Sequence, residues 1–265
     1  VKDLTPEEIK RFFVFQYKIV VSPTNVNRNK VDNMSDNGET VSQIDQLMLE
    51  ASEVADSGNL ESALKLYDEI VRMSPGNVKA LVGKGDCYMK LQFPDNAETC
   101  FDQACLIEPD YSKGWLRLGL LALHKTDNKK ADICFNKCLE NDSDNDRAYC
   151  GLGMVRINRN DLDGAVDYFC KSLDLNPENL SACKFLLEIS YKLEQFGEIE
   201  IYLNKFMELH PANLNMRFGL AGIQYKRGKL EDSLKNLEYI LALDPEHDSA
   251  REMLDSVRSD VVLSK

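Results

Sequence analysis

The stretch WLRLGLLALHKTDNKKADICF, at residues 115–135, decides the fold, because its small and aromatic positions recur along the chain every 34 residues. Gly119 follows Trp115 by four residues, and Phe135 follows Ala131 by four. An uninterrupted period of this length predicts a solenoid in which each repeat is a helix-turn-helix unit. The alanine recurs at Ala63, Ala97, Ala131 and Ala165, and the aromatic residue at Tyr67, Phe101, Phe135 and Phe169.

The remaining positions of each block support a pair of packed helices. A small residue in the first half lets two antiparallel helices approach closely, and the aromatic residue of the second half fills the space beside it. A closing proline then ends the second helix, since proline lacks an N–H and disfavours helix at the residue before it. The small residue lies at Ala51, Gly85, Gly119, Gly153 and Ala221, with Leu187 as the exception, and the closing position at Pro75, Pro109, Ser143, Pro177, Pro211 and Pro245.

This pattern resembles the tetratricopeptide repeat, whose consensus is matched best by residues 115–119 and 131–135. We expect an all-α, right-handed superhelical solenoid of six helix-turn-helix repeats over residues 44–247, because the period never slips. Residues 248–263 carry apolar side chains at helical spacing, which predicts a capping helix, with a short tail to residue 265. The fifth and sixth blocks keep the period and are interpreted as degenerate repeats, with departures at Cys183, Leu187, Ile199, Leu203, Arg217 and Ser233.

Residues 1–43 lie outside the repeats. A dense apolar run begins at Phe12 and ends at Val21, and the polar stretch that follows over residues 22–40 is typical of a flexible tether. An apolar run left in water would promote aggregation, so we expect it to be buried against apolar surface of this chain or of a neighbouring copy, the second case being self-association. The chain begins at Val1 without a methionine, as a fragment or a processed product would.

Composition limits the kinds of partner that the chain is expected to bind and indicates the cellular compartment. The chain of 265 residues is 43% hydrophobic, and its net charge of −12 argues against nucleic acid as a partner, because a polyphosphate would be repelled. The sequence contains no secretory signal and no apolar run of about 20 residues, so a transmembrane span is not expected. All eight cysteines fall on predicted helices, and no pair is placed to join a loop, which favours a reducing, cytoplasmic setting.

Metal, cofactor and catalytic sites are not expected. Cys134 and Cys138 are one helical turn apart and Cys100 precedes them by one repeat, but no CxxC pair is present, so helix packing is favoured over a zinc site. The alternating aspartates within residues 141–146 resemble the start of a calcium loop, yet Gly153 occupies the place of the bidentate glutamate. We interpret this segment as a helix stop followed by the N-cap of the next helix. The absence of phosphate-loop and hydrolase motifs predicts a protein without enzymatic activity.

The predicted binding site is the concave face of the solenoid, where the resemblance implies that first helices bind extended peptides or helices. The inward positions of repeats two to four are mainly apolar, with basic residues along the edge. Apolar helical spacing alone does not separate such a surface from core between repeats. The predicted groove consists of Val82, Asp86, Met89, Lys113, Leu116, Arg117, Leu120, Leu123, Arg147, Cys150, Met154 and Ile157, with Lys79 at its edge.

One subgroup of the family holds the C-terminal carboxylate of chaperones with a set of Lys, Arg and Asn side chains. Lys113 and Arg117 match part of that set. The other places hold Met48, Ser52 and Gly83, so chaperone-tail binding is rejected. Two hypotheses remain for function. The first is a non-enzymatic adaptor whose groove binds an apolar or amphipathic segment of a partner protein. The second is the regulatory or docking part of a larger enzyme whose catalytic domain lies upstream.

Overall fold

The computed structural model describes the backbone of residues 36–263 and the side chains of residues 42–263. The apolar run from Phe12 to Val21, and with it the prediction of self-association, lies outside the described residues. The chain divides into two units, Val1–Ser42 and Gln43–Lys265. All the helices from α3 onward belong to the second unit.

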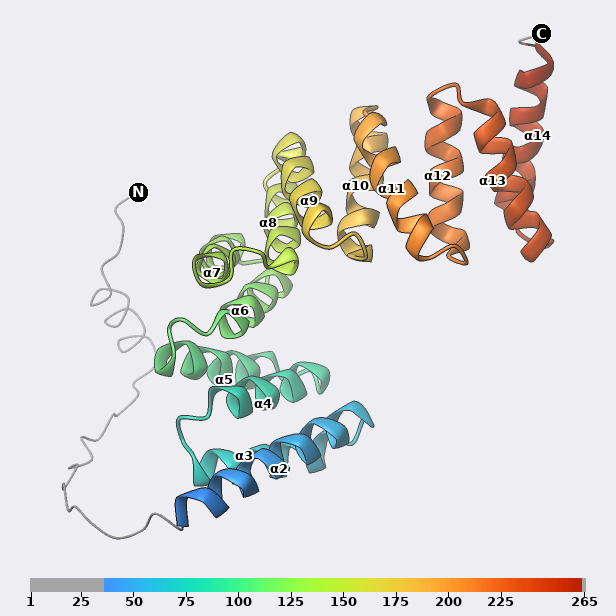
Figure 1. The fold of residues 1–265 in the computed structure, drawn as a ribbon. Coiled ribbons are helices and arrows are strands. Elements are labelled where there is room, and N and C mark those ends of the chain that lie inside the picture. The colour runs from blue at the N-terminus through green and yellow to red at the C-terminus, as the bar shows by residue number, and fades with distance from the viewer. Residues whose placement is uncertain (1–35, 264–265) are drawn as a thin grey trace. The chain divides into compact units, whose positions relative to one another are not determined.

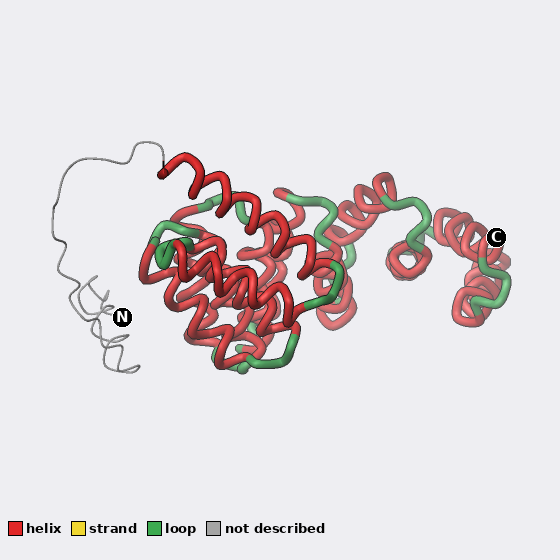
Figure 2. The backbone as a smooth tube through the Cα atoms, turned by 90° about the horizontal axis from the view of Figure 1, so that it is seen from below, coloured by secondary structure: helices red, strands yellow, loops and turns green. Residues whose placement is uncertain are grey.

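The described residues fold into thirteen α-helices and contain no β-strand (Figure 1, Figure 2). From α3 onward each helix packs on the next, which confirms the predicted all-α helical-repeat solenoid. None of the described helices is long and apolar enough to cross a membrane. The helices are α2 (Asp36–Asp56), α3 (Leu60–Met73), α4 (Val78–Lys90), α5 (Pro94–Ile107), α6 (Ser112–His124), α7 (Asn128–Asn141), α8 (Asp146–Asn158), α9 (Leu162–Leu175), α10 (Leu180–Leu193), α11 (Gly197–Leu209), α12 (Leu214–Lys226), α13 (Leu230–Leu243) and α14 (Asp248–Leu263).

Each helix begins and ends where local chemistry favours it. The first helices α4, α8, α10 and α12 follow an asparagine whose side chain accepts a hydrogen bond from a backbone N–H of the first turn. For α8 this residue is Asn145, and Asp142 closes α7, which confirms that residues 141–146 join a helix stop to an N-cap. The turn inside each helix pair has one residue in the left-handed region, at Gly58, Gln92, Thr126, Asn160, Glu194 and Gly228.

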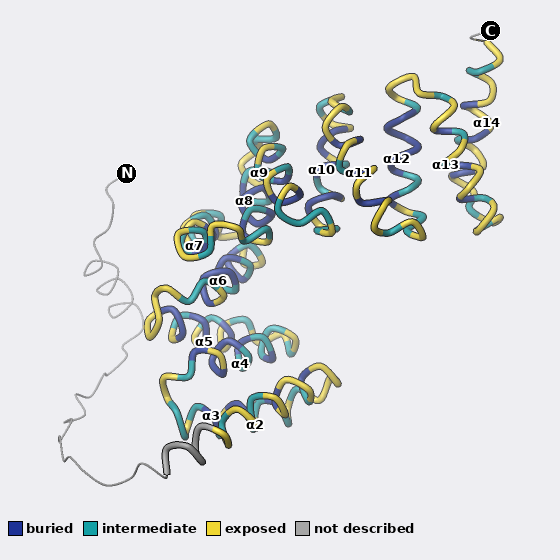
Figure 3. The backbone as a smooth tube through the Cα atoms, viewed as in Figure 1, coloured by how far each residue is buried: buried dark blue, intermediate teal, exposed yellow. Residues whose placement is uncertain are grey.

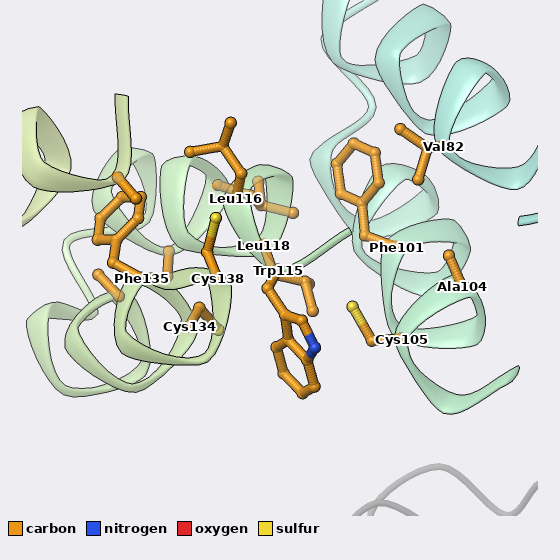
Figure 4. Packing of buried hydrophobic residues seen from close by; sticks show 14 of the residues in the cluster. Val82, Phe101, Ala104, Cys105, Trp115, Leu116, Leu118, Cys134, Phe135 and Cys138 are labelled. Atoms are coloured by element: carbon orange, nitrogen blue, oxygen red, sulfur yellow. The ribbon is translucent and has the colours of Figure 1, made fainter. Parts of the chain in front are cut away.

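The core forms where small residues of first helices meet aromatic residues of second helices. A Cβ atom placed on Gly119 would lie 2.6 Å from the ring of Phe135, and one placed on Gly153 would lie 2.7 Å from the ring of Phe169. Both rings are fully buried. Figure 4 shows Phe135 and Phe101 within the largest hydrophobic cluster. The predicted pairing of a small residue with an aromatic one is therefore confirmed.

The fifth repeat shows how a departure from the pattern is accommodated. Leu187 stands in α10 where most other first helices have glycine or alanine. Its side chain packs against α12, where a Cβ atom placed on Gly219 would lie 2.6 Å from it. Ile199 and Leu203 of α11 replace the usual alanine and aromatic residue, and both are fully buried. A glycine on the following first helix thus supplies the space that the larger side chain needs.

The start of α2 differs from the expectation. We expected a flexible tether up to residue 40, but α2 begins at Asp36, so residues 36–40 belong to the helix. The apolar periodicity begins only at Ile44, so a search for that periodicity starts the helix too late.

Candidate partner-binding face

The first helices of repeats two to four form one continuous surface. α6 contacts α4 on one side and α8 on the other, in addition to the second helices on which it packs. Within the described residues, no contact of comparable extent joins the second helices α5, α7 and α9 to one another. Neighbouring first helices therefore come closer together than neighbouring second helices. We call the exposed surface of α4, α6 and α8 the first-helix face.

Three of the predicted groove residues belong to the core instead. Val82, Leu116 and Cys150 have only 6%, 4% and 6% of their surface exposed. Each occupies the same position of its first helix. Val82 and Leu116 belong to the largest hydrophobic cluster, and Cys150 belongs to the cluster of the following repeats. These side chains hold neighbouring helices together and leave little area for a partner.

The other predicted apolar residues of the groove keep one side toward solvent. They are partly buried and pack against the same two clusters. Figure 3 shows this intermediate burial beside the dark blue core positions of α4, α6 and α8. Because α6 contacts both α4 and α8, equivalent positions on the three helices form one apolar band. We call this band the apolar strip; it consists of Met89, Leu120, Leu123, Met154 and Ile157.

An ion pair crosses the first-helix face between α4 and α6. Nε of Arg117 lies 2.7 Å from Oδ1 of Asp86, and both side chains are partly exposed, so the pair contributes at most about 1 kcal/mol to stability. Both residues are predicted groove residues, but their pairing does not follow from the repeat pattern. Helical spacing relates residues within one helix and says nothing of contacts between two. Because Arg117 already binds a carboxylate of its own chain, it is less suited to bind the C-terminal carboxylate of a chaperone.

Three basic residues lie at the same position of successive first helices. Lys79, Lys113 and Arg147 are the second residues of α4, α6 and α8, and all three are exposed. No carboxylate among residues 42–263 forms an ion pair with them, although other cations of the same helices are paired. We call these three residues the cationic row. The row lies at the N-terminal ends of these helices, whereas the apolar strip lies in their C-terminal halves.

The thiols of repeats two and three are packing groups. All eight cysteines are free, and Cys105, Cys134 and Cys138 are buried. Burial raises the pKa of Cys134 to about 12 and the pKa of Cys138 to about 11, so the thiolate that a metal needs would be costly to form. In the part of the chain that the structure describes, no three His, Cys, Asp or Glu side chains are arranged to hold a metal ion.

Comparison with known proteins agrees with this architecture. Sequence profiles described as tetratricopeptide repeat match residues 54–118, 112–145 and 146–179. Curated protein sequences give no match. The pilF protein of Pseudomonas aeruginosa superposes with a TM-score of 0.68 at 15% identity, over 82% of this chain and 99% of that chain. PilW, a widely conserved type IV pilus biogenesis factor, superposes with a TM-score of 0.64 at 19% identity, over 80% and 98% of the two chains.

A third solved structure is YrrB, described as a tetratricopeptide repeat protein with an unusual peptide-binding site. It superposes with a TM-score of 0.54 at 15% identity, over 71% of this chain and 96% of that chain. Identities this low establish the fold alone. The sequence profiles add evidence from the repeat residues themselves, and the helix pairs continue beyond the matched residues to α13. The chain therefore belongs to the tetratricopeptide repeat family.

Proposed function

We propose that this protein is a non-enzymatic interaction scaffold whose first-helix face binds an apolar or amphipathic segment of a partner protein. Tetratricopeptide repeat proteins are generally protein-interaction scaffolds, which supports the broad part of the proposal. The observation that carries the specific part is the apolar strip, which crosses three helices and keeps one side exposed. Apolar side chains of a partner would cover such a band.

The apolar strip supplies only part of the binding energy. Fully burying a large aliphatic side chain contributes about 1.5–3 kcal/mol, and these side chains are already partly buried, so covering all of them contributes on the order of 5 kcal/mol. Association costs roughly 4–15 kcal/mol in lost freedom of movement. The strip alone therefore supports weak, reversible binding, and a tight complex requires further contacts.

A peptide-display selection tests this proposal. Random peptides selected on the wild-type protein are measured on Leu120→Asp and Leu120→Lys, which place a charge of either sign on the apolar strip. Both substitutions should weaken binding by at least about tenfold, because the covering peptide would desolvate the charge. Melting temperatures show whether each variant is folded.

The matched control for this experiment is Ile133→Asp. Ile133 lies on α7 and is 58% exposed, so the substitution adds the same charge to an apolar position away from the first-helix face. Peptide binding to this control should equal binding to the wild type. Undiminished binding to both Leu120 variants, or a selection that yields no peptide, would contradict the proposed function.

We also propose a reducing, cytoplasmic setting. Eight free cysteines, seven of them buried, support it, because buried thiols act as small hydrophobic side chains and form no cross-link here. Thiol alkylation followed by mass spectrometry of the protein from its natural source should find all eight cysteines reduced. A disulfide at any of them would contradict this setting.

A further inference from the structure

Charge is divided unequally between the two kinds of helix. From the second repeat onward, the first helices α4, α6, α8, α10 and α12 contain eleven Lys or Arg residues and only three Asp or Glu residues. The first helix of the first repeat, α2, is the exception, because it has no basic residue and carries Asp45, Glu50, Glu53 and Asp56. The second helices α3, α5, α7, α9, α11 and α13 contain eight basic and seventeen acidic residues. The whole chain has a net charge of −12, so these five first helices are positive in a molecule that is negative overall.

The cationic row concentrates positive charge where helix formation disfavours it. Lys79, Lys113 and Arg147 lie in first turns, where the positive end of the helix macrodipole repels a cation. The same small cost on three successive helices points to a role outside the fold. Five of the six second helices follow the opposite preference, with an acidic second residue at Glu61, Asp95, Asp163, Glu198 and Glu231, and α7 is the exception, with Lys129.

The row also differs from other cations on the same helices. Three of the four other Lys and Arg residues on these helices are engaged by carboxylates of the same chain, and Lys90 at the C-terminal end of α4 is the exception. The cationic row has no such carboxylate among residues 42–263, so its charge is available to a partner. The engaged pairs are Lys84–Asp68 at 2.6 Å, Arg117–Asp86 at 2.7 Å and Arg156–Asp161 at 3.5 Å.

We infer that the partner is an acidic amphipathic segment of a protein, which places carboxylates against the cationic row and apolar side chains on the apolar strip. This inference rests on the proposed function of the first-helix face and specifies the chemistry of its partner. Charge complementarity at exposed cations accelerates association and selects the partner, while the apolar strip contributes the desolvated contact.

One segment can reach both features. Lys113 precedes Leu120 and Leu123 on α6 by seven and ten residues, which is about 10–15 Å along a helix. An α-helix with its side chains is about 10–12 Å wide, so an amphipathic helix lying across the three first helices would span from row to strip. Its acidic edge would face the row and its apolar edge would face the strip.

A nucleic acid fits the same face less well. Polyphosphate binding gains strength with the number of phosphates that are neutralised, and the row offers only three cations, in a solenoid whose second helices α5 and α9 are predominantly acidic. Single-stranded nucleic acids also stack their bases on aromatic side chains, whereas the apolar strip contains only Met, Leu and Ile. The observations therefore favour a protein segment.

The display selection described above tests this inference through the composition of the selected peptides. They should combine an excess of Asp and Glu with apolar residues. Their affinity for the variant K79E/K113E/R147E should fall by at least about tenfold. The matched variant K65E/K171E/K205E makes the same change in net charge at exposed lysines of α3, α9 and α11, and it should bind the peptides as the wild type does.

The outcomes separate the two proposals. Selected peptides that bind through Leu120 but have no excess of acidic residues would overturn the acidic partner and leave the proposed function standing. Equal losses in the two triple variants, or tighter binding of a random single-stranded oligonucleotide than of any selected peptide, would also overturn it. Weaker peptide binding to K79E/K113E/R147E alone, with no fall in its melting temperature, supports the acidic partner.

Discussion

From α4 to α13, first and second helices alternate along this solenoid, and most of them differ in their chemistry. Second helices supply the aromatic residues that fill the core, and most of them have acidic residues in their first turn, where the macrodipole favours negative charge. First helices supply small residues to the core, and three of them have a cation at the end that disfavours it. Second helices thus follow the requirements of helix stability, whereas α4, α6 and α8 depart from them on the surface proposed to bind a partner.

The largest expected effect distinguishes the core from the first-helix face. Phe135→Ala should lower the free energy of unfolding by about 3–5 kcal/mol, because the ring is fully buried against Gly119 and Gly151. Leu120→Ala should cost only about 1–2 kcal/mol, since this side chain is partly exposed on the apolar strip. Urea unfolding followed by circular dichroism measures both. Equal losses would show that Leu120 is a core residue.

A buried second-helix carboxylate that has only one long ion pair should increase the stability of the protein when its charge is removed. Asp102 of α5 is mostly buried, and its nearest cation, Nζ of Lys130, lies 3.7 Å away. Burial raises the pKa of Asp102 to about 6, although Lys130 opposes the shift. The folded state therefore holds this proton more firmly than the unfolded state, and stability falls as pH rises from about 4 to about 6. Asp102→Asn should stabilise by about 1–3 kcal/mol above that range and have no effect below it.

Glu98 in the same helix is the matched control for Asp102. Burial alone would raise the pKa of Glu98, but hydrogen bonds from Lys125 and Lys130 outweigh burial and lower it. The ionised carboxylate thus stabilises the fold near neutral pH, and this contribution is lost as pH falls through the acidic range. Glu98→Gln should destabilise the protein at pH 7 and be neutral in acid. Thermal unfolding across pH would contradict both predictions if the two variants shifted stability at pH 7 in the same direction.

Reversing the cationic row should keep the protein stable while removing peptide binding. In K79E/K113E/R147E each first turn gains a favourable charge, so the free energy of unfolding should rise by about 1–2 kcal/mol at low salt. The control K65E/K171E/K205E should show no such gain, because its substitutions lie outside the first turns. Chemical unfolding at low and high salt measures the difference. A loss of stability in the first variant would show that the row stabilises the fold.

The smallest effect is expected in the turn that joins a first helix to its second helix. Thr126 has a φ of 59°, in the left-handed region that disfavours a β-branched residue, and Gly58 and Gly228 occupy equivalent turns. Thr126→Gly should therefore stabilise by up to about 1 kcal/mol. Asn160→Gly should increase stability by a smaller amount, because asparagine tolerates the left-handed region better than threonine does. Melting temperatures in the opposite order would contradict this explanation.

The helix pairs could be predicted well from the sequence, because most repeats contain both of the residues that pack on each other. Gly119 and Phe135 lie in one repeat and pack on each other, so their spacing is a local signal of the fold. The binding face was predicted less well. A first helix is covered by its own second helix and by the next repeat, so apolar residues at helical spacing mark core and surface alike. Val82 and Leu116 are core for this reason, whereas Leu120 of the same helix as Leu116 stays partly exposed.

Contacts between side chains of different repeats could not be predicted from the 34-residue period. The ion pair of Asp86 with Arg117 joins two first helices, and Leu187 finds its space at Gly219 of the following repeat. Neither pairing follows from a period that relates equivalent positions only. The charge difference between first and second helices is present in the sequence, but it becomes visible only after each residue is assigned to its helix.

An exchange of charge between protein and peptide tests the acidic partner most directly. A selected acidic peptide, and the same peptide with Lys in place of its Asp and Glu residues, are measured by fluorescence anisotropy on the wild-type protein and on K79E/K113E/R147E. We predict that the acidic peptide binds the wild type, that the basic peptide binds the variant, and that both crossed combinations are weaker by at least about tenfold. A basic peptide that binds the wild type as tightly as the acidic peptide does, or an acidic peptide that binds both proteins equally, would contradict the account.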